Sequence, residues 1–224
     1  MSTTATYPAR LDGRLDQPLS RWLWLVKWVL VIPHVVVLVF LWLALVVLTF
    51  VAGVAILFTG TYPRSIFDFN VGVMRWTWRV SFYTLSAFAT DKYPPFSLQS
   101  DPAYPADFDV AYPEHLSRGL VLVKWWLLAI PHYLIVGVFA GGWGVAFRNG
   151  GWQAGGTGLV SLLAVIAMVI TLVGRRYPQG LFDFIMGMNR WCYRVLAYAA
   201  LLRDEYPPFR LDSGGADPAA PSPA

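Results

Sequence analysis

The sequence predicts an all-α integral membrane protein built as a tandem repeat, on three observations. The chain is 57% hydrophobic and 13% charged, whereas about 25% of the residues in a typical soluble domain are charged. A segment at 62–83 returns at 177–198 with the shared frame Y-P-x-x-apolar-F-D-F-x-x-G-x-x-R-W-x-x-R-V-x-x-Y. The run 22–58 contains only Lys27 and His34 as ionisable residues. Lipid is therefore expected to be the solvent for much of the chain.

Each repeat is expected to supply a helical hairpin of two membrane spans, one amphipathic helix in the membrane interface, and short β-strand segments at the cytoplasmic face. The expected ranges follow. Repeat 1 covers 1–101, with spans at about 20–40 and 43–59 and an interfacial helix at about 65–90. Repeat 2 covers 102–211, with spans at about 117–147 and 158–174 and an interfacial helix at about 180–203. A disordered tail rich in Pro, Ala and Gly covers 212–224.

The hairpin is preferred because the apolar run 22–58 is too long for one straight crossing. As a helix it would be about 55 Å long, and the hydrocarbon core is about 30 Å thick. In the other interpretation, 20–32 lies in the interface, the chain turns at Pro33, and 34–58 spans once. The second copy carries an extra glycine-rich stretch at 148–157. Its backbone would be unsatisfied in the middle of a crossing, so it favours a hairpin with the insertion at its tip.

The distribution of charge predicts the topology. If both hairpins return and both interfacial helices lie on the surface, all of the 17 lysines and arginines except Arg148 fall on one side. The positive-inside rule places that side, with both termini, in the cytoplasm.

Short extended segments flank the helices of both copies. Residues 7–17 and 104–114 correspond, and Phe108, Val110 and Tyr112 alternate with small or polar residues in the manner of a strand. Two Tyr-Pro-Pro-Phe segments, at 93–98 and 206–211, have an extended backbone fixed by their prolines. These four segments are expected to pair into a small sheet outside the membrane.

The repeated segment places charged residues on one helical stripe. In the first copy Asp68, Gly72, Arg75 and Arg79 recur at helical spacing. One interpretation is structural, with the aspartate paired to an arginine and the stripe docking the helix. The other is that the guanidinium groups bind lipid phosphate. The hypothetical lipid- or partner-binding residues are Asp68, Arg75, Trp76, Arg79, Asp183, Arg190, Trp191 and Arg194.

Lys27, His34, Lys124 and His132 are the intramembrane polar candidates. Such residues are functional hypotheses by default, here for a proton or anion path between the repeats. The structural alternative is that the lysines snorkel and each histidine bonds carbonyls freed by the preceding proline. Lys27 and His34 are seven residues apart, but Lys124 and His132 are eight apart, about 100° out of the first alignment.

Several classes of function have no support in the sequence. The single cysteine, Cys192, excludes an internal disulfide and a Cys-rich metal site. No serine has a G-x-S-x-G setting and no glycine-rich stretch carries G-K-[ST]. The basic residues lie beside Trp and apolar runs, which argues against a nucleic-acid surface. No catalytic residue, cofactor or metal is expected.

The assembled motifs resemble a bacterial membrane-protein family of unknown function, with one or two copies of a module of about 100 residues. The resemblance rests on Ile32-Pro33-His34, Thr59–Arg64, Phe67-Asp68-Phe69, Arg75-Trp76, Arg79-Val80 and Thr90–Phe96, and on their second-copy equivalents. The second copy departs at Gly174–Tyr177, where Thr-Gly is lost. The resemblance implies a bacterial inner-membrane protein and carries over no activity.

The expected function is therefore that of a multi-pass, non-catalytic scaffold or accessory subunit. A basic and aromatic cytoplasmic face would bind anionic lipid headgroups or a membrane-protein partner. The alternative is a small transporter or channel with a pathway between the two repeats.

Overall fold

The computed structural model describes residues 7–20, 22–141, 145–148, 151–154, 158–174 and 176–211. The elements in chain order are β1 (Ala9–Gly13), α1 (Leu23–Leu30), α2 (Ile32–Thr59), α3 (Arg64–Tyr83), β2 (Ala106–Val110), α4 (Arg118–Val123), the π-helix η1 (Lys124–Leu128), α5 (Ile130–Ala140), β3 (Val145–Arg148), β4 (Gly151–Ala154), α6 (Leu159–Gly174) and α7 (Gln179–Ala199). The tail at 212–224, predicted to be disordered, lies outside the described residues.

The predicted two-span hairpin of repeat 1 is wrong, because α2 is one continuous helix from Ile32 to Thr59. No Gly or Pro lies in 40–44 to stop a helix there, and Trp42 instead fastens α2 to Thr77 of α3. The chain breaks earlier, at Val31 between α1 and α2. The interpretation that we set aside, with a break near Pro33 followed by one long helix, is closer to the structure.

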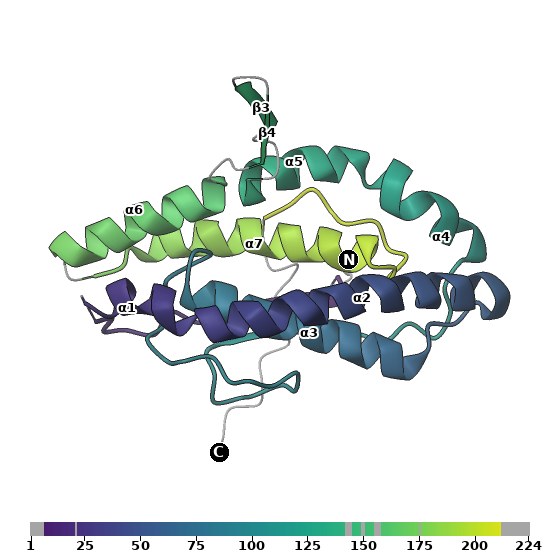
Figure 1. The fold of residues 1–224 in the computed structure, drawn as a ribbon, viewed down its shortest axis with the longest axis horizontal. Coiled ribbons are helices and arrows are strands. Elements are labelled where there is room, and N and C mark those ends of the chain that lie inside the picture. The colour runs from purple at the N-terminus through teal and green to yellow at the C-terminus, as the bar shows by residue number, and fades with distance from the viewer. Residues whose placement is uncertain are drawn as a thin grey trace, which may run out of the picture.

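The insertion of repeat 2 does not lie at the tip of a hairpin of spans. The helices α5 and α6 have 11 and 16 residues and together correspond to the 28 residues of α2. The insertion falls between them and carries the β3–β4 ribbon, which projects away from α7 (Figure 1). Gly158 lies so close to the end of α5 that a Cβ on it would be 2.4 Å from the carbonyl oxygen of Phe139.

The predicted interfacial helices exist as α3 and α7, but both are largely buried instead of lying on the surface. In each repeat this helix packs along the long apolar element, α2 for α3, and α5 with α6 for α7 (Figure 1). Strands cover another side and cross between the repeats, since β2 packs on α3 and β1 packs on α7. The fully buried Trp78 and Phe82 show how little of α3 is accessible.

Of the four extended segments, two form strands that pair. Strands β1 and β2 are antiparallel, with Leu11 opposite Phe108 at the centre of the register, and their alternate side chains are buried. The Tyr-Pro-Pro-Phe segments form no strand, because a proline has no N–H to donate to a ladder. Their aromatic rings contact His34 of α2 and His132 of α5.

The outer surface of α2 is apolar along its whole length. Large side chains stay exposed on it, including Phe40 at 67%, Phe50 at 75% and Phe58 at 77%. Within the described residues, α2 is the helix long and apolar enough to cross a membrane. A second candidate exists only if the pair 118–128 and 130–140 is taken as one span despite its 49° bend. The expectation of four spans is therefore wrong.

Candidate functional site

The two intramembrane lysines predicted from sequence occupy matching buried sites. Lys27 of α1 is 2% exposed, and its Nζ donates to the carbonyl oxygen of Thr90 at 2.6 Å and lies 3.0 Å from Asp91 Oδ1. The Asp91 carboxylate also accepts the backbone N–H of Ser20, just before α1. Burial lowers the pKa of Lys27, and the hydrogen bond and charge of Asp91 oppose that shift.

Lys124 repeats this arrangement with the loop that follows α7. Its Nζ lies 2.7 Å from both the carbonyl oxygen of Arg203 and Oδ1 of Asp204. The Asp204 carboxylate accepts the N–H of Ser117, at the start of α4. Each aspartate thus joins a helix start to a buried ammonium group, which is a structural use of the charge.

The π-helix explains how both lysines reach equivalent sites despite their different spacing from the histidines. Repeat 2 has one more residue between Lys124 and His132, and η1 begins at Lys124. A π turn holds an extra residue relative to an α turn. The extra residue is therefore absorbed locally, and the 100° misalignment expected from an ideal helix does not occur.

The two histidines also occupy matching, closed sites. The Nδ1 atom of His34 accepts the indole N–H of Trp76 at 3.0 Å, and the His34 ring stacks on Phe96 at 3.9 Å between centroids. In repeat 2, His132 accepts from Trp191 at 3.2 Å and stacks on Phe209 at 4.5 Å. The aromatic residues of the Tyr-Pro-Pro-Phe segments thus cover the histidines.

This hydrogen bond determines the form of each imidazole ring. Because Nδ1 accepts a hydrogen bond, it is unprotonated, and Nε2 must carry the one proton of a neutral ring. Neither Nε2 atom has a hydrogen-bond partner within the described part of the chain. The one lone pair of such a ring, on Nδ1, is already occupied by the indole N–H, and the described residues contain no group of three or more potential metal ligands.

The lysines and histidines do not converge on one cavity between the repeats. The space beside Lys27 has a volume of about 20 Å³ and is lined by residues that include Asp91 and Met168. Such a space holds about one water molecule. All four residues are at most 2% exposed, and each has its polar partner within its own repeat.

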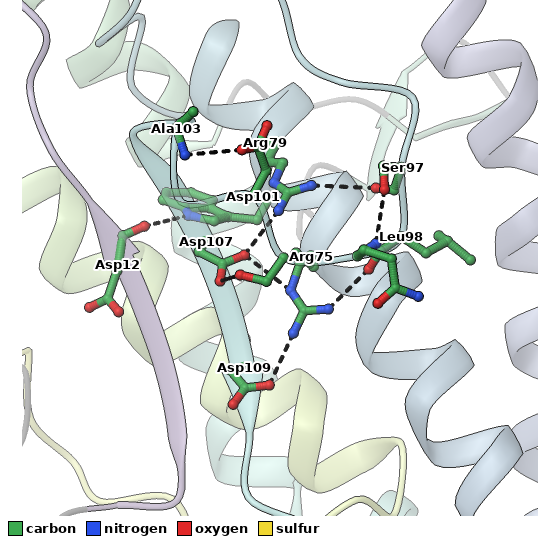
Figure 2. A network of polar contacts seen from close by, with 12 residues as sticks. Asp12, Arg75, Arg79, Ser97, Leu98, Asp101, Ala103, Asp107 and Asp109 are labelled. Atoms are coloured by element: carbon green, nitrogen blue, oxygen red, sulfur yellow. Dashed lines mark hydrogen bonds and ion pairs between the residues drawn. The ribbon is translucent and has the colours of Figure 1, made fainter.

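Arg75 and Arg79 are bound by carboxylates on β2 (Figure 2). Asp107 lies 3.0 Å from Arg75 and 3.2 Å from Arg79, and Asp109 lies 3.0 Å from Arg75. Arg75 also donates to the carbonyl oxygen of Leu98. This geometry matches the structural interpretation of the stripe, with acids supplied by another element instead of by Asp68.

The repeated glycine lets the segment after Tyr-Pro-Pro-Phe approach α3 and α7. A Cβ on Gly72 would lie 2.8 Å from the Cβ of Leu98, and one on Gly187 would lie 2.7 Å from the carbonyl oxygen of Leu211. Both glycines are therefore needed for close packing.

The arginines of repeat 2 have different surroundings. Arg190 donates to the carbonyl oxygen of Leu11 at 3.3 Å. Arg194 donates to the carbonyl oxygen of Arg210 at 3.2 Å and lies over the ring of Tyr7.

The other candidates from the stripe divide between the surface and the interior. Asp68 is exposed and pairs with Arg64 one turn earlier, and Asp183 accepts from Gln179. Trp76 and Trp191 are buried against the histidines. The set predicted to bind lipid thus does not form one surface, and its binding role stays a prediction.

Sequence reasoning missed the acidic partners Asp91, Asp204, Asp107 and Asp109. The first two were visible, because both repeats have Asp two positions before Tyr-Pro-Pro-Phe. Asp107 and Asp109 lie on β2. This strand packs on α3 of the other repeat only in the tertiary structure, so a local sequence pattern does not reveal the pairing.

These features define a mostly helical protein with one strongly apolar surface helix, a small two-stranded sheet and buried charge clusters of structural character. The chain belongs to the family described as Domain of unknown function (DUF4389), whose model matches residues 21–97 and 153–210. No curated protein and no solved structure matches the chain.

Proposed function

We propose that this protein is a non-catalytic scaffold or accessory subunit held at a membrane that contains anionic lipid. The observation that carries the proposal is the exposed apolar surface of α2, including Phe40, Leu43 and Phe50. Water is a poor solvent for a continuous apolar surface of this length. The chain's excess of basic residues favours the cytoplasmic side of a bacterial inner membrane, with both termini on that side.

The lipid contact that we propose differs from the arginine stripe. A guanidinium group already bound by buried carboxylates, as in Arg75 and Arg79, would have to break those pairs to take a phosphate. Exposed arginines lie at helix ends instead: Arg64 begins α3, Arg118 lies beside Gly60 at the end of α2, and Arg176 precedes α7. Arg64 pairs with Asp68, but both side chains are exposed, and such a surface pair contributes little and is readily exchanged for a phosphate. These three supply the proposed contacts with anionic headgroups.

Vesicle flotation tests this proposal. The intact chain should float with vesicles that contain phosphatidylglycerol and less well with pure phosphatidylcholine. Changing Arg64, Arg118 and Arg176 to Gln removes three charges worth about 1 kcal/mol each near such a surface, so binding should weaken roughly 100-fold.

The matched control changes charges on and beside the strands. The variant Arg10→Gln with Arg14→Gln should bind anionic vesicles within about twofold of the intact chain. These two arginines are not among the proposed headgroup contacts, and the attraction of a charge to the membrane surface falls off with distance. An equal loss in both variants would contradict the assignment to the helix ends. Failure of the intact chain to bind any vesicle would contradict membrane attachment.

A further inference from the structure

We infer that α2 lies in the plane of the membrane with its exposed apolar side in one leaflet, and does not cross. This inference rests on the proposed attachment to a membrane and states its geometry. The occupant of the apolar surface is then the acyl region of a single leaflet. Two features, one in each repeat, carry the inference.

The first feature is where the charged residues of α3 and the strands lie relative to the two ends of α2. Two hydrogen bonds fix α3 beside the middle of α2: Trp42 Nε1 donates to Thr77 at 3.0 Å, and Asn70 donates to Thr49 at 3.1 Å. Arg75 lies between Asn70 and Thr77 along α3. The arginine and its strand partners are therefore level with the centre of α2.

The strands at this level need water. The side chain of Asp109, which pairs with Arg75, is 66% exposed, and those of Arg10 and Asp12 on β1 are 51% and 64% exposed. If α2 crossed upright, these charges would lie at the depth of the bilayer centre. Each charged side chain there costs about 2.5–3.5 kcal/mol or more, so an upright α2 is strongly disfavoured.

The second feature is the insertion in repeat 2. It lies between α5 and α6, at the middle of the element that corresponds to α2, and carries the projecting β3–β4 ribbon (Figure 1). A two-stranded ribbon leaves unpaired backbone groups at its edges, and these are not tolerated against lipid. In a flat orientation no part of α5 or α6 is deep in the membrane, so the ribbon can reach headgroups or water.

The flat orientation also suits the aromatic residues around the apolar surface. Trp22, Trp28, Trp125 and Trp126 are exposed on α1, η1 and the residue before α1. Tryptophan is enriched where acyl chains meet headgroups. In a flat orientation these exposed side chains can reach that interface.

Depth measurement by spin labelling tests this geometry in the full chain. In a Cys192→Ala background, single cysteines at Val36, Leu43 and Phe50 carry a nitroxide; all three residues are exposed and lie on one side of α2 because they are seven residues apart. The protein is bound to phosphatidylglycerol/phosphatidylcholine vesicles, and the exposure of each label to oxygen and to a water-soluble nickel chelate gives its depth. A label at Ala103, which is exposed beyond the strands, is the control that should remain in water.

A flat α2 gives three labels at one shallow depth of about 5–10 Å. A crossing α2 gives labels spread over about 21 Å along the membrane normal, with Leu43 deepest, and that result would overturn the inference while leaving membrane attachment intact. Strong coupling between labels of two chains, with no exposure to oxygen in lipid, would show that a second copy covers the surface, which also overturns it. Absence of binding to vesicles would refute both proposals together.

Discussion

The arginines of α3 and α7 occupy the same positions in the repeated segment, yet their charges are balanced differently. In both repeats one arginine donates to a carbonyl of the chain after Tyr-Pro-Pro-Phe, Ser97 for Arg79 and Arg210 for Arg194. The facing strand differs. Asp107 of β2 binds Arg75 and Arg79, whereas the residue of β1 that aligns with Asp107 in the other copy is Arg10.

This difference distinguishes the packing contacts that both repeats share from the ion pairs that depend on the facing strand. The carbonyl contact and the close approach at Gly72 and Gly187 recur in both repeats, so they belong to the packing of the segment. Of the two carboxylates of β2, Asp109 has the counterpart Asp12 on β1, whereas Asp107 has none. Both β2 carboxylates neutralise guanidinium groups that are nearly or fully buried in repeat 1. The structural interpretation therefore predicts unequal consequences when the two strands are altered.

The largest expected effect is that of Asp107→Ala. The change leaves Arg79, whose side chain is fully buried, without its carboxylate and removes one of two acids from Arg75. Breaking a buried ion pair costs about 3–5 kcal/mol, and we expect about 3 kcal/mol because Asp107 is partly exposed. Chemical unfolding in mild detergent, followed by circular dichroism, measures the loss.

The comparison with Arg10→Ala makes that prediction specific. Arg10 is at the corresponding position of β1 and its side chain is half exposed, so its removal should change the unfolding free energy by no more than about 0.5 kcal/mol. Equal losses for the two variants would show that the strands, and not the buried carboxylate, determine stability.

Short-range sequence patterns predicted those helices and strands that depend on local residue spacing. The helices α3 and α7 and the strand at β2 follow from residue spacing. The break before α2 was not predicted, because one span was expected over about 20–40. The hairpins were wrong because membrane thickness was used to divide a run that has no helix-breaking residue in 40–44. The crossing of β1 and β2 to the other repeat depends on tertiary packing, which no single segment encodes.

The next prediction concerns the two histidine sites, which are alike where the arginine sites differ. Trp76→Phe removes the donor to His34 Nδ1 and leaves a buried acceptor unsatisfied, which costs about 1–3 kcal/mol. Trp191→Phe should cost the same within about 0.5 kcal/mol, because His132 has the same partner and covering rings.

The single variant His34→Phe and a double variant together separate this hydrogen bond from simple loss of volume. The double variant His34→Phe with Trp76→Phe removes both polar partners and should recover part of the lost stability. A double variant that loses the full sum of the single effects would contradict a coupled pair.

Of the buried polar sites, only the lysines and histidines were predicted as site residues of this kind. Lys27, His34, Lys124 and His132 stand out because they interrupt apolar runs. Their partners Asp91, Asp204, Trp76 and Trp191 lie far along the chain, in a loop and on another helix. The periodicity of a single helix cannot identify partners that lie on other elements. It also predicted that Lys124 and His132 are misaligned, because it assumed an ideal α-helix where the structure has the π-helix η1.

The smallest expected effect tests that last point. Deleting Trp126, an exposed residue within η1, restores in repeat 2 the seven-residue spacing found between Lys27 and His34. If the π-helix serves only to absorb the extra residue, the shortened segment becomes α-helical and Lys124 still reaches Asp204. The unfolding free energy should then change by no more than about 0.5 kcal/mol, the range for surface changes. Adding Asp204→Ala should cost as much in the shortened chain as in the intact one. A smaller cost in the shortened chain would mean that the π-helix is what places Lys124, and that repeat 1 reaches the same contact by a different route.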